Sequence, residues 1–457
     1  MKSTNPITGA PVWEGEAASA DTVRTAVAHA RDAFHTFSLT PLTERIAMME
    51  RWAEAVTARK EEIARAISDE IGKPMWEART EAGAMAGKVA HSIRAQAERA
   101  GSSESEAMSL HHRPHGVMAV LGPFNFPGHL PNGHIVPALL AGNTVVFKPS
   151  ELAPSVGAIF TELADAAGLP DSVLSVVQGG RETGAALLEA DIDGLLFTGS
   201  AATGTFFHRH FAGRPGVILA LEMGGNNPLI VHDAADMEAA ADIAIVSAFI
   251  SAGQRCSCAR RLILPTGAFG DAVLERMSAR IAALSIGAPD EDVFIGSVVS
   301  EGAAKAAVAF EADLAKKGGR SIVGLERDGA FLRPGMMDVT DADSPDEEIF
   351  APFLQVHRID GIDAQIAAAN TTRFGLAAGL VSDDADLWDY TRPRLRAGIA
   401  NWNKPTTGAA SSMPFGGPGL SGNFRPGAYY AADYCAWPQA SQIAATPESP
   451  ALPNFQA

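Results

Sequence analysis

The chain has 457 residues, which is more than one hydrophobic core usually organises, so we expect two or three domains. A hydrophobic fraction of 47% and a charged fraction of 19% are typical of a well-packed globular protein. The net charge of −17 argues against nucleic acid or an anionic membrane as a partner, although a cleft can still be locally positive. No apolar run is long enough to span a membrane, and the N-terminus lacks the apolar core of a signal peptide.

The cysteine content indicates a reducing compartment. Three cysteines are too few for a disulfide framework, so we expect a cytoplasmic protein. Cys256 and Cys258 form a C-x-C pair and Cys435 is remote in sequence. Together they are too few for a structural zinc site without several histidines, and no H-E-x-x-H helix supplies these. We therefore expect no bound metal.

In chain order, the sequence changes from helical to alternating patterns. Residues 19–100 are rich in Ala, Glu and Arg, with apolar residues at three- and four-residue spacing, which predicts helices. Short apolar runs then alternate with helical stretches, which predicts parallel βαβ units in a doubly wound sheet. A second alternating region covers about 228–430, beyond the Gly-rich "EMGGNNP". We therefore predict two α/β lobes with a cleft between them, and a strand or arm after Trp437.

Two segments are candidates for binding a dinucleotide. The first comprises Gly199, Ser200, Ala201, Ala202, Thr203 and Gly204. This segment begins a predicted helix, whose free N–H groups can face a pyrophosphate. A plain Gly-rich turn is the alternative. The second places Lys148 and Glu151 after a buried strand. A carboxylate there can accept ribose hydroxyls and would repel a 2′-phosphate, which favours NAD over NADP. An ordinary surface Lys–Glu pair is the alternative for these two residues.

Three residues are candidates for catalysis. Cys256 is a possible nucleophile if its thiol is activated, and the flanking Arg255 and Arg260 would make the local field more positive. Glu222 ends an apolar strand before two glycines, where a carboxylate is costly unless it is paired or acts as a base. Asn125 lies in "GPFNFP", and its amide can donate to a developing oxyanion. The alternatives are a buried packing cysteine, a capping or ion-paired glutamate, and a turn-forming asparagine.

The order of these motifs resembles one family. "GPFNFP", "KPSE", "FTGSAATG", "LEMGGNNP", "GQRC", "EEIFAP" and "PFGGPGLSG" follow one another as they do in the aldehyde dehydrogenase superfamily, and the resemblance covers nearly the whole chain. Longer stretches such as "AGQRCSCARR" and "NWNKPTTGAAS" are similar to the branch that oxidises the 5-semialdehyde of N-succinylglutamate in arginine catabolism. The alternatives are a dehydrogenase of another anionic semialdehyde, succinic or glutamic, and a non-catalytic structural paralogue.

The resemblance implies a fold and a mechanism. The fold would be α/β, with two doubly wound Rossmann-like domains and a small bridging β element. The NAD-binding domain would comprise residues 1–97 and 116–222, the catalytic domain 223–428, and the oligomerisation segments 98–115 and 429–457. Cys256 would attack the aldehyde, Asn125 would hold the oxyanion, and Glu222 would activate water to hydrolyse the thioester. Glu348 and Phe350 would contact the nicotinamide ribose of NAD, Lys148 and Glu151 the adenosine ribose, and Ser200 the pyrophosphate.

The resemblance also bears on substrate and assembly. A small anionic aldehyde needs cations in the cleft, and Arg255, Arg425 and Arg113 are the candidates, with His129 as a hydrogen-bonding residue. Ala351 replaces a glycine that the family usually has after "E-I-F", and N-terminal strands common in relatives are lacking. Cys258 matches no catalytic role, so we predict that it packs. We expect a homodimer or homotetramer.

Overall fold

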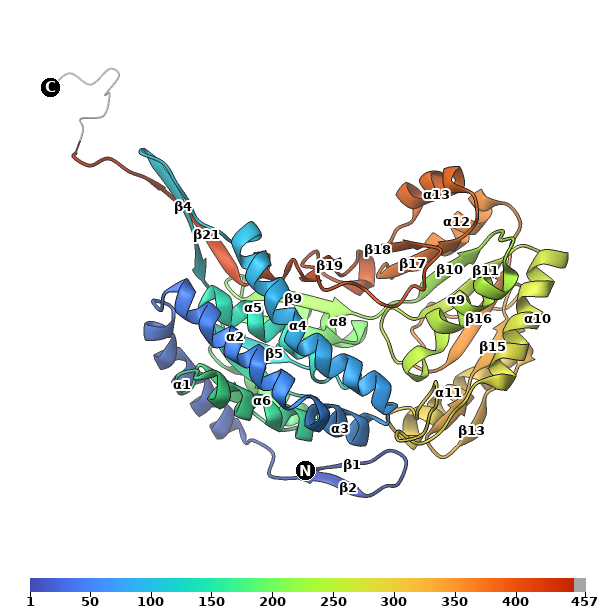
Figure 1. Cartoon of the computed structure of the whole chain (residues 1–457), viewed down its shortest axis with the longest axis horizontal. Coiled ribbons are helices and arrows are strands. Elements are labelled where there is room, and N and C mark those ends of the chain that lie inside the picture. The colour runs from blue at the N-terminus through green and yellow to red at the C-terminus, as the bar shows by residue number, and fades with distance from the viewer. Residues whose placement is uncertain (448–457) are drawn as a thin grey trace, which may run out of the picture.

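The computed structural model describes residues 1–447, and two α/β lobes dominate it (Figure 1). The first lobe is built on a parallel five-stranded sheet in the order β7-β6-β5-β8-β9. Its strands are β5 (Val117–Leu121), β6 (Thr144–Lys148), β7 (Leu174–Val176), β8 (Gly194–Gly199) and β9 (Ile218–Met223). All five residues of β5 and of β6 are buried, as expected for a sheet covered on both faces.

Helices cover both faces of this sheet. One face packs against α2 (Leu42–Ala58), α3 (Lys60–Ile71), α4 (Met75–Arg99), α5 (His129–Ala141) and α6 (Pro154–Ala167). The other packs against α1 (Ala20–Phe37), α7 (Arg181–Glu189) and α8 (Ala201–His210). Helix α1 begins where the Ser19 side chain accepts a hydrogen bond from the Thr22 amide, and α3 ends at Gly72, whose φ of 79° suits glycine. The predicted helical region 19–100 is confirmed.

The second lobe contains a seven-stranded sheet in the order β12-β15-β16-β11-β10-β17-β18. Only β12 runs antiparallel to its neighbour. The strands are β10 (Asn227–Val231), β11 (Ala259–Leu264), β12 (Arg320–Val323), β15 (Gly335–Asp338), β16 (Phe353–Arg358), β17 (Ala377–Val381) and β18 (Ile399–Trp402). The flanking helices are α9 (Met237–Phe249), α10 (Ala268–Ala283), α11 (Glu301–Lys316), α12 (Ile362–Asn370) and α13 (Ala385–Thr391).

Smaller elements complete the described chain. An arm of three antiparallel strands projects from the first lobe, and it pairs β4 (Met108–Pro114) with β3 (Ser103–Glu104) and β21 (Ala436–Gln442) (Figure 1). The remaining pieces are β1 (Lys2–Thr4), β2 (Pro11–Glu14), β13 (Glu326–Asp328), β14 (Phe331–Arg333), β19 (Pro414–Phe415), β20 (Gly427–Ala428), α14 (Ala431–Tyr434) and the 3₁₀ turns η1 (Ile250–Gly253), η2 (Arg392–Arg394) and η3 (Gly419–Ser421). The predicted strand after Trp437 corresponds to β21, and residues 448–457 of the predicted bridging segment lie outside the described residues.

The polypeptide passes from one lobe to the other directly after β9. Residues 224–226 join β9 of the first sheet to β10 of the second, so Glu222 lies at the end of the first sheet and beside the crossing. No helix within residues 1–447 is long and apolar enough to cross a membrane. The predicted α/β class with two parallel sheets is confirmed.

Candidate active site

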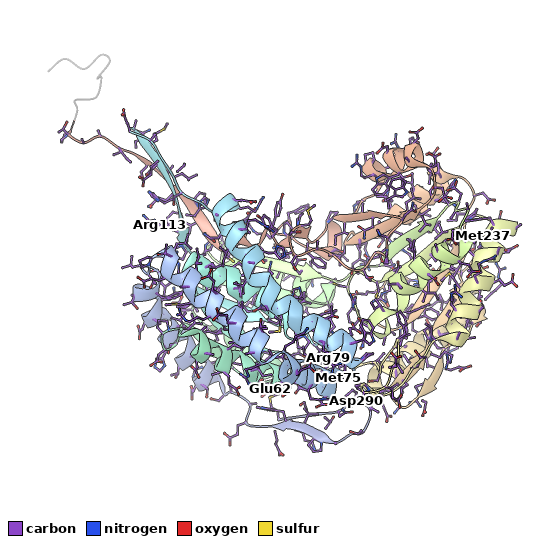
Figure 2. All side chains as sticks on the ribbon, in the orientation of Figure 1. Glu62, Met75, Arg79, Arg113, Met237 and Asp290 are labelled. Carbon is purple, nitrogen blue, oxygen red and sulfur yellow. The ribbon has the colours of Figure 1, made fainter. Side chains whose placement is uncertain are left out.

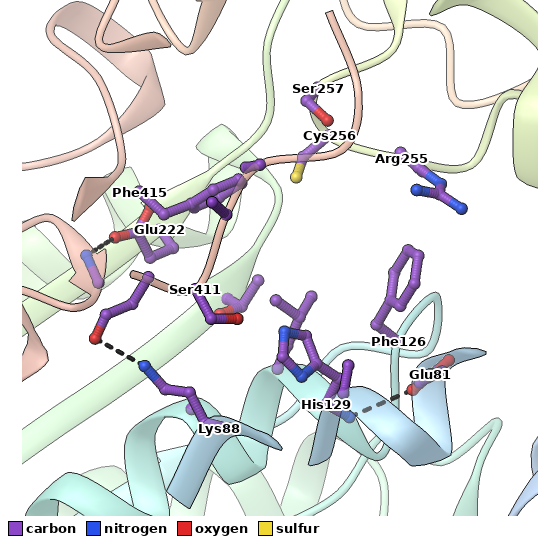
Figure 3. Close-up of a pocket in the computed structure, with 18 of the residues that line it drawn as sticks. Glu81, Lys88, Phe126, His129, Glu222, Arg255, Cys256, Ser257, Ser411 and Phe415 are labelled. Carbon is purple, nitrogen blue, oxygen red and sulfur yellow. Dashed lines mark hydrogen bonds between the residues drawn. The ribbon is translucent and has the colours of Figure 1, made fainter. Parts of the chain in front are cut away.

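A cavity of about 300 Å³ brings together two of the three catalytic candidates. Cys256 and Glu222 both line it, from different lobes (Figure 3). Its wall also contains one side of α4, the first turns of α5, and the loop between β18 and β19. Two segments predicted separately from the sequence therefore meet at a single concave site, which is the usual form of a small-molecule site.

The backbone around Cys256 has an unusual conformation. Ser251 and Ala252 in η1 have φ of 57° and 52°, and Gly253 has φ of 71°. A Cβ atom on Gly253 would lie 2.2 Å from the Ala351 carbonyl oxygen, so glycine permits the close approach of these two segments. Strained turns of this kind persist only where the surrounding structure holds them.

Two buried side chains hold this turn. The Asn227 amide nitrogen donates to the carbonyl oxygens of Cys256 and Cys258, at 2.7 and 2.9 Å. The Arg260 guanidinium donates to the carbonyl oxygens of Gly253 and Arg255, at 2.6 and 3.1 Å. Cys258 is fully buried, as its predicted packing role requires. The position of the Cys256 thiol is therefore fixed by groups that lie behind it.

The protonation of Cys256 differs from the sequence expectation. Burial, and then the nearby Glu348 and Glu222 carboxylates, raise the pKa of Cys256 to about 12. Arg255 and Arg260 were expected to make the field at the thiol more positive, but the pKa of Cys256 is raised and not lowered. Arg255 forms an ion pair with Glu77, and Arg260 donates to backbone carbonyls, so their charges are used elsewhere. Cys256 is a thiol at neutral pH in this structure, and a base or a bound ligand must assist its ionisation.

Glu222 is a buried carboxyl group with one free oxygen. Its Oε1 accepts a hydrogen bond of 2.5 Å from the Gly427 amide, and Oε2 has no hydrogen-bond partner among the described residues. Burial raises the pKa of Glu222 to about 8. A carboxyl group with this pKa beside a nucleophile suits proton transfer near neutral pH. Among the described residues Glu222 neither caps a helix nor forms an ion pair, which were the two alternatives for it.

Asn125 lies beside the nucleophile turn rather than in the cavity wall. It is 4% exposed, and its Nδ2 donates to the Gln254 carbonyl oxygen at 3.0 Å. Because a side-chain amide has two N–H donors, one remains for an oxyanion formed at Cys256. The contact with Gln254 also fixes which way the amide faces.

The dinucleotide candidates lie at the carboxyl ends of β6 and β8, on either side of β5. Lys148 donates to the carbonyl oxygens of Pro149 and Gly179, at 2.9 and 2.7 Å, and its Nζ lies 3.8 Å from the exposed Glu151 carboxylate. Burial lowers the pKa of Lys148. At this edge of a parallel sheet, a lysine that donates hydrogen bonds and a carboxylate that accepts them can bind the hydroxyls of a ribose.

The glycine-rich segment forms the start of α8. Ser200 caps the helix, and its Oγ accepts a hydrogen bond of 3.3 Å from the Thr203 amide. Gly199 and Gly204 are tightly packed, since a Cβ on either would lie within 2.4 Å of Phe197 or Met223. Ala201 and Ala202 form the first turn, which has no acidic residue. Free amides, small side chains and the positive end of a helix fit a pyrophosphate.

Glu348 and Phe350 lie near the nucleophile turn. Glu348 Oε1 accepts a hydrogen bond of 3.2 Å from Gly225, and burial raises its pKa to about 7 despite the opposing charge of Arg260. The Phe350 ring packs edge-on against Phe124, with 5.8 Å between the ring centroids. Ala351 does not have a positive φ, so its methyl group causes no backbone strain at this position.

Two of the four predicted substrate residues lie at the cavity. Arg255 and His129 line it, and Arg255 also lies over the Phe126 ring (Figure 3). Burial lowers the pKa of His129 to about 4, so this histidine is neutral. Within the described chain, the structure does not bring Arg113 or Arg425 to the cavity. Arg113 is on β4 of the arm and donates to Gln439 (Figure 2), and Arg425 is exposed.

Comparisons with known proteins agree with this site. The family model described as aldehyde dehydrogenase family matches residues 1–439. The chain belongs to the aldehyde dehydrogenase family. It is an oxidoreductase, and members of this family act on aldehydes with NAD or NADP.

Individual relatives are similar over almost their whole length. A Caulobacter vibrioides protein named N-succinylglutamate 5-semialdehyde dehydrogenase 2 is 56% identical, over 96% of this chain and 93% of its own. A Burkholderia mallei protein named N-succinylglutamate 5-semialdehyde dehydrogenase is 54% identical, over 98% of this chain and 94% of its own. The crystal structure of an NAD-dependent aldehyde dehydrogenase from Sinorhizobium meliloti superposes with a TM-score of 0.92, at 31% identity, covering 98% of this chain and 92% of that one. The predicted family and fold are therefore confirmed.

Sequence reasoning missed Asn227 and Lys88 of this dehydrogenase, and it missed the structural role of Arg260. Asn227 and Arg260 hold the nucleophile turn, and Lys88 enters the cavity from α4. Asn227 is the second asparagine of the quoted "EMGGNNP", and Arg260 follows the cysteine pair, so their positions were a usable signal. Lys88 occurs in a helix rich in charged residues, and nothing in that pattern marks it as buried.

Proposed function

We propose that the enzyme oxidises N-succinyl-L-glutamate 5-semialdehyde to N-succinyl-L-glutamate, with NAD as the oxidant. The observation that carries this proposal is the shared cavity of Cys256 and Glu222, which provides a nucleophile and a base for one small aldehyde. The substrate assignment rests on relatives that are 54–56% identical and carry that name. The same reaction on succinic or glutamic semialdehyde is the alternative.

The first half of the reaction forms a covalent adduct. The Cys256 thiol gives up its proton to water in the cavity, its sulfur bonds to the aldehyde carbon, and the carbonyl π electrons move to the oxygen. The free N–H of Asn125 and the Cys256 backbone amide hold the resulting oxyanion. NAD, held at the carboxyl ends of β6 and β8, would supply the two-electron acceptor by which this carbon is oxidised to the level of a thioester on Cys256. Asn227 and Arg260 keep the sulfur in place throughout, because they hold the backbone on both sides of it.

The second half releases the acid. Glu222 takes a proton from water, and the oxygen attacks the thioester carbon while the carbon–sulfur bond breaks. The free Oε2 is the oxygen that can face this water, since Oε1 is held by Gly427. The products are a carboxylic acid and the regenerated Cys256 thiol.

The remaining predicted contacts complete the proposal. Lys148 and Glu151 would bind the adenosine ribose, the start of α8 the pyrophosphate, and Glu348 with Phe350 the nicotinamide ribose. The exposed Glu151 carboxylate favours NAD, because a 2′-phosphate there would meet a like charge. The first lobe would therefore bind NAD, and the second would supply the nucleophile. We further propose that the β4–β21 arm bridges subunits of a homodimer or homotetramer in the cytoplasm.

A substrate comparison tests this function. Formation of NADH by the purified enzyme is followed with N-succinylglutamate, succinic and glutamic semialdehydes, and kcat/KM is compared. A large preference for the succinylated compound supports the proposal. Equal or faster turnover of a simpler semialdehyde contradicts the substrate assignment, while leaving the family chemistry in place.

A further inference from the structure

The cavity wall contains cations whose charges are not equally available. Arg255 Nη2 lies 3.1 Å from Glu77, whose side chain is 1% exposed. Behind the wall, Lys73 Nζ lies 2.7 Å from the fully buried Glu81 carboxylate, which also accepts from the amides of Gly128 and His129. Arg255 and Lys73 therefore each have an anionic partner already, and the charges of Glu77 and Glu81 are each balanced by a cation.

Lys88 is the exception at this cavity. It is 2% exposed, yet its Nζ makes one hydrogen bond, of 2.7 Å, to the Ala428 carbonyl oxygen (Figure 3). No carboxylate of the described residues lies within ion-pair distance of it. An ammonium group has three N–H donors, so two remain for a ligand. A buried cation without an anion is costly, and such groups are usually paired or functional.

The surroundings of Lys88 supply no compensating negative charge. The titratable groups around it are His91 on its own helix, His129 and His134 on α5, and Cys435 after α14. Glu222 lines the same cavity, and burial raises its pKa to about 8, so it is mostly protonated at neutral pH. Burial lowers the pKa of all three histidines and raises that of the Cys435 thiol above its usual range, so all four are neutral near pH 7. Burial also lowers the pKa of Lys88 to about 8, which leaves it mostly protonated at neutral pH.

We propose that Lys88 binds a carboxylate group of the anionic aldehyde substrate. This inference rests on the proposed function, and it names the cation that selects an acidic aldehyde over an uncharged one. Lys88 and Cys256 line the same cavity from opposite lobes, so a substrate can place its aldehyde at the sulfur and its carboxylate at Nζ. Arg255 remains a wall residue whose charge is balanced by Glu77.

The test compares an anionic and an uncharged aldehyde in three forms of the enzyme. N-succinylglutamate semialdehyde and pentanal are assayed with the wild type, Lys88→Met, and the control Lys305→Met, which removes an exposed lysine charge on α11. For Lys88→Met we expect the ratio of kcat/KM, anionic over uncharged, to fall about 10- to 100-fold, mainly through KM. Lys305→Met should keep the wild-type ratio. A folded Lys88→Met enzyme with the wild-type ratio overturns the inference.

The pH dependence of the wild-type enzyme provides a second measurement. Above pH 8 Lys88 loses its proton, so KM for the anionic aldehyde should rise relative to KM for pentanal. Glu222 ionises over the same range and would also repel the anionic aldehyde, and the same pH series with Lys88→Met measures that contribution alone. A ratio of KM values that stays constant from pH 7 to pH 9 contradicts the role of Lys88.

The two proposals fail in different ways. If the wild type prefers succinic semialdehyde, the proposed substrate is wrong. The ratio of kcat/KM for succinic semialdehyde to kcat/KM for pentanal, compared between the wild type and Lys88→Met, then still decides the role of Lys88. If the wild type prefers the succinylated compound and Lys88→Met keeps that preference, only the role of Lys88 is wrong.

Discussion

Lys88 and Glu222 are held by consecutive residues of one short strand. Lys88 Nζ donates to the Ala428 carbonyl oxygen at 2.7 Å, and the Gly427 amide donates to Glu222 Oε1 at 2.5 Å. Ala428 has a φ of 55°, so this strand is held in a conformation that alanine rarely adopts. The proposed substrate cation and the proposed base are therefore positioned by the same two residues.

Replacing Glu222 with Gln should separate the two halves of the reaction. The amide cannot take a proton from water, so steady-state kcat should fall about 100- to 10,000-fold. The thioester still forms, and rapid-mixing absorbance should show a burst of up to one NADH per active site before the slow phase. A variant with no burst and no turnover would place Glu222 in the first half of the reaction.

The pH dependence of kcat should follow Glu222. Burial raises its pKa to about 8, so the carboxylate that acts as a base forms only as the pH rises through that value. When hydrolysis limits the rate, log kcat should increase with pH below about 8 and level off above it. The Cys256 thiol does not produce this limb, because it is already acylated at that step. The limb should be absent from Glu222→Gln; if it persists there, another group is responsible.

Asn125→Ala should weaken the oxyanion contact. Loss of one such donor typically lowers kcat about 100- to 1000-fold, with a smaller effect on KM. The same change removes the contact with the Gln254 carbonyl oxygen, so thermal unfolding must be measured alongside the kinetics. Asn125→Asp has nearly the same shape but no donor, and it should be at least as slow. Near-normal kcat in both variants would exclude this role for Asn125.

Arg255 should prove important for stability through Glu77. Arg255→Met leaves the buried Glu77 carboxylate without its cation, and breaking such a pair typically costs about 3–5 kcal/mol. The double variant Arg255→Met, Glu77→Gln removes both charges and should recover most of the loss in the free energy of unfolding. Denaturant unfolding of the two single variants and the double variant measures this. A double variant as unstable as Arg255→Met would show that the pair is not the cause.

Cofactor preference should depend on Glu151. Glu151→Gln removes the carboxylate expected to repel a 2′-phosphate, so kcat/KM for NADP relative to NAD should rise about five- to tenfold. Glu182→Gln removes an acidic side chain in the first turn of α7, and it serves as the control for a lost surface charge. An unchanged ratio in Glu151→Gln would show that another residue selects the cofactor.

The sequence predicted the fold from local signals, whereas it brought Cys256 and Glu222 together only through the resemblance to the family. Alternating apolar runs and helices define the two sheets. No local signal shows that the end of β9 in the first sheet meets the turn before β11 in the second. The raised pKa of Cys256 was not predictable, because it depends on how deeply the thiol is buried and on the Glu348 carboxylate, which lies 92 residues later in the chain.

Side chains placed by long-range packing were the main failures. Arg113 appeared suitable because it precedes "PHG", but β4 pairs with β21, more than 300 residues later in the chain, and this pairing carries it onto the arm. Lys88 is buried only because α4 packs against α5 and the strand at 427–428 closes over it. Neither fact leaves a periodic signal in the sequence around these residues.

The most direct test of the account is the mass of the protein trapped in mid-reaction. Glu222→Gln is mixed with NAD and N-succinylglutamate semialdehyde, digested, and examined by mass spectrometry. The account predicts an N-succinylglutamyl thioester on Cys256, its absence from the Cys256→Ser, Glu222→Gln double variant, and its retention when Cys258 is changed to Ser. An acyl group on another residue, or NADH formed without any acylated protein, would contradict the account.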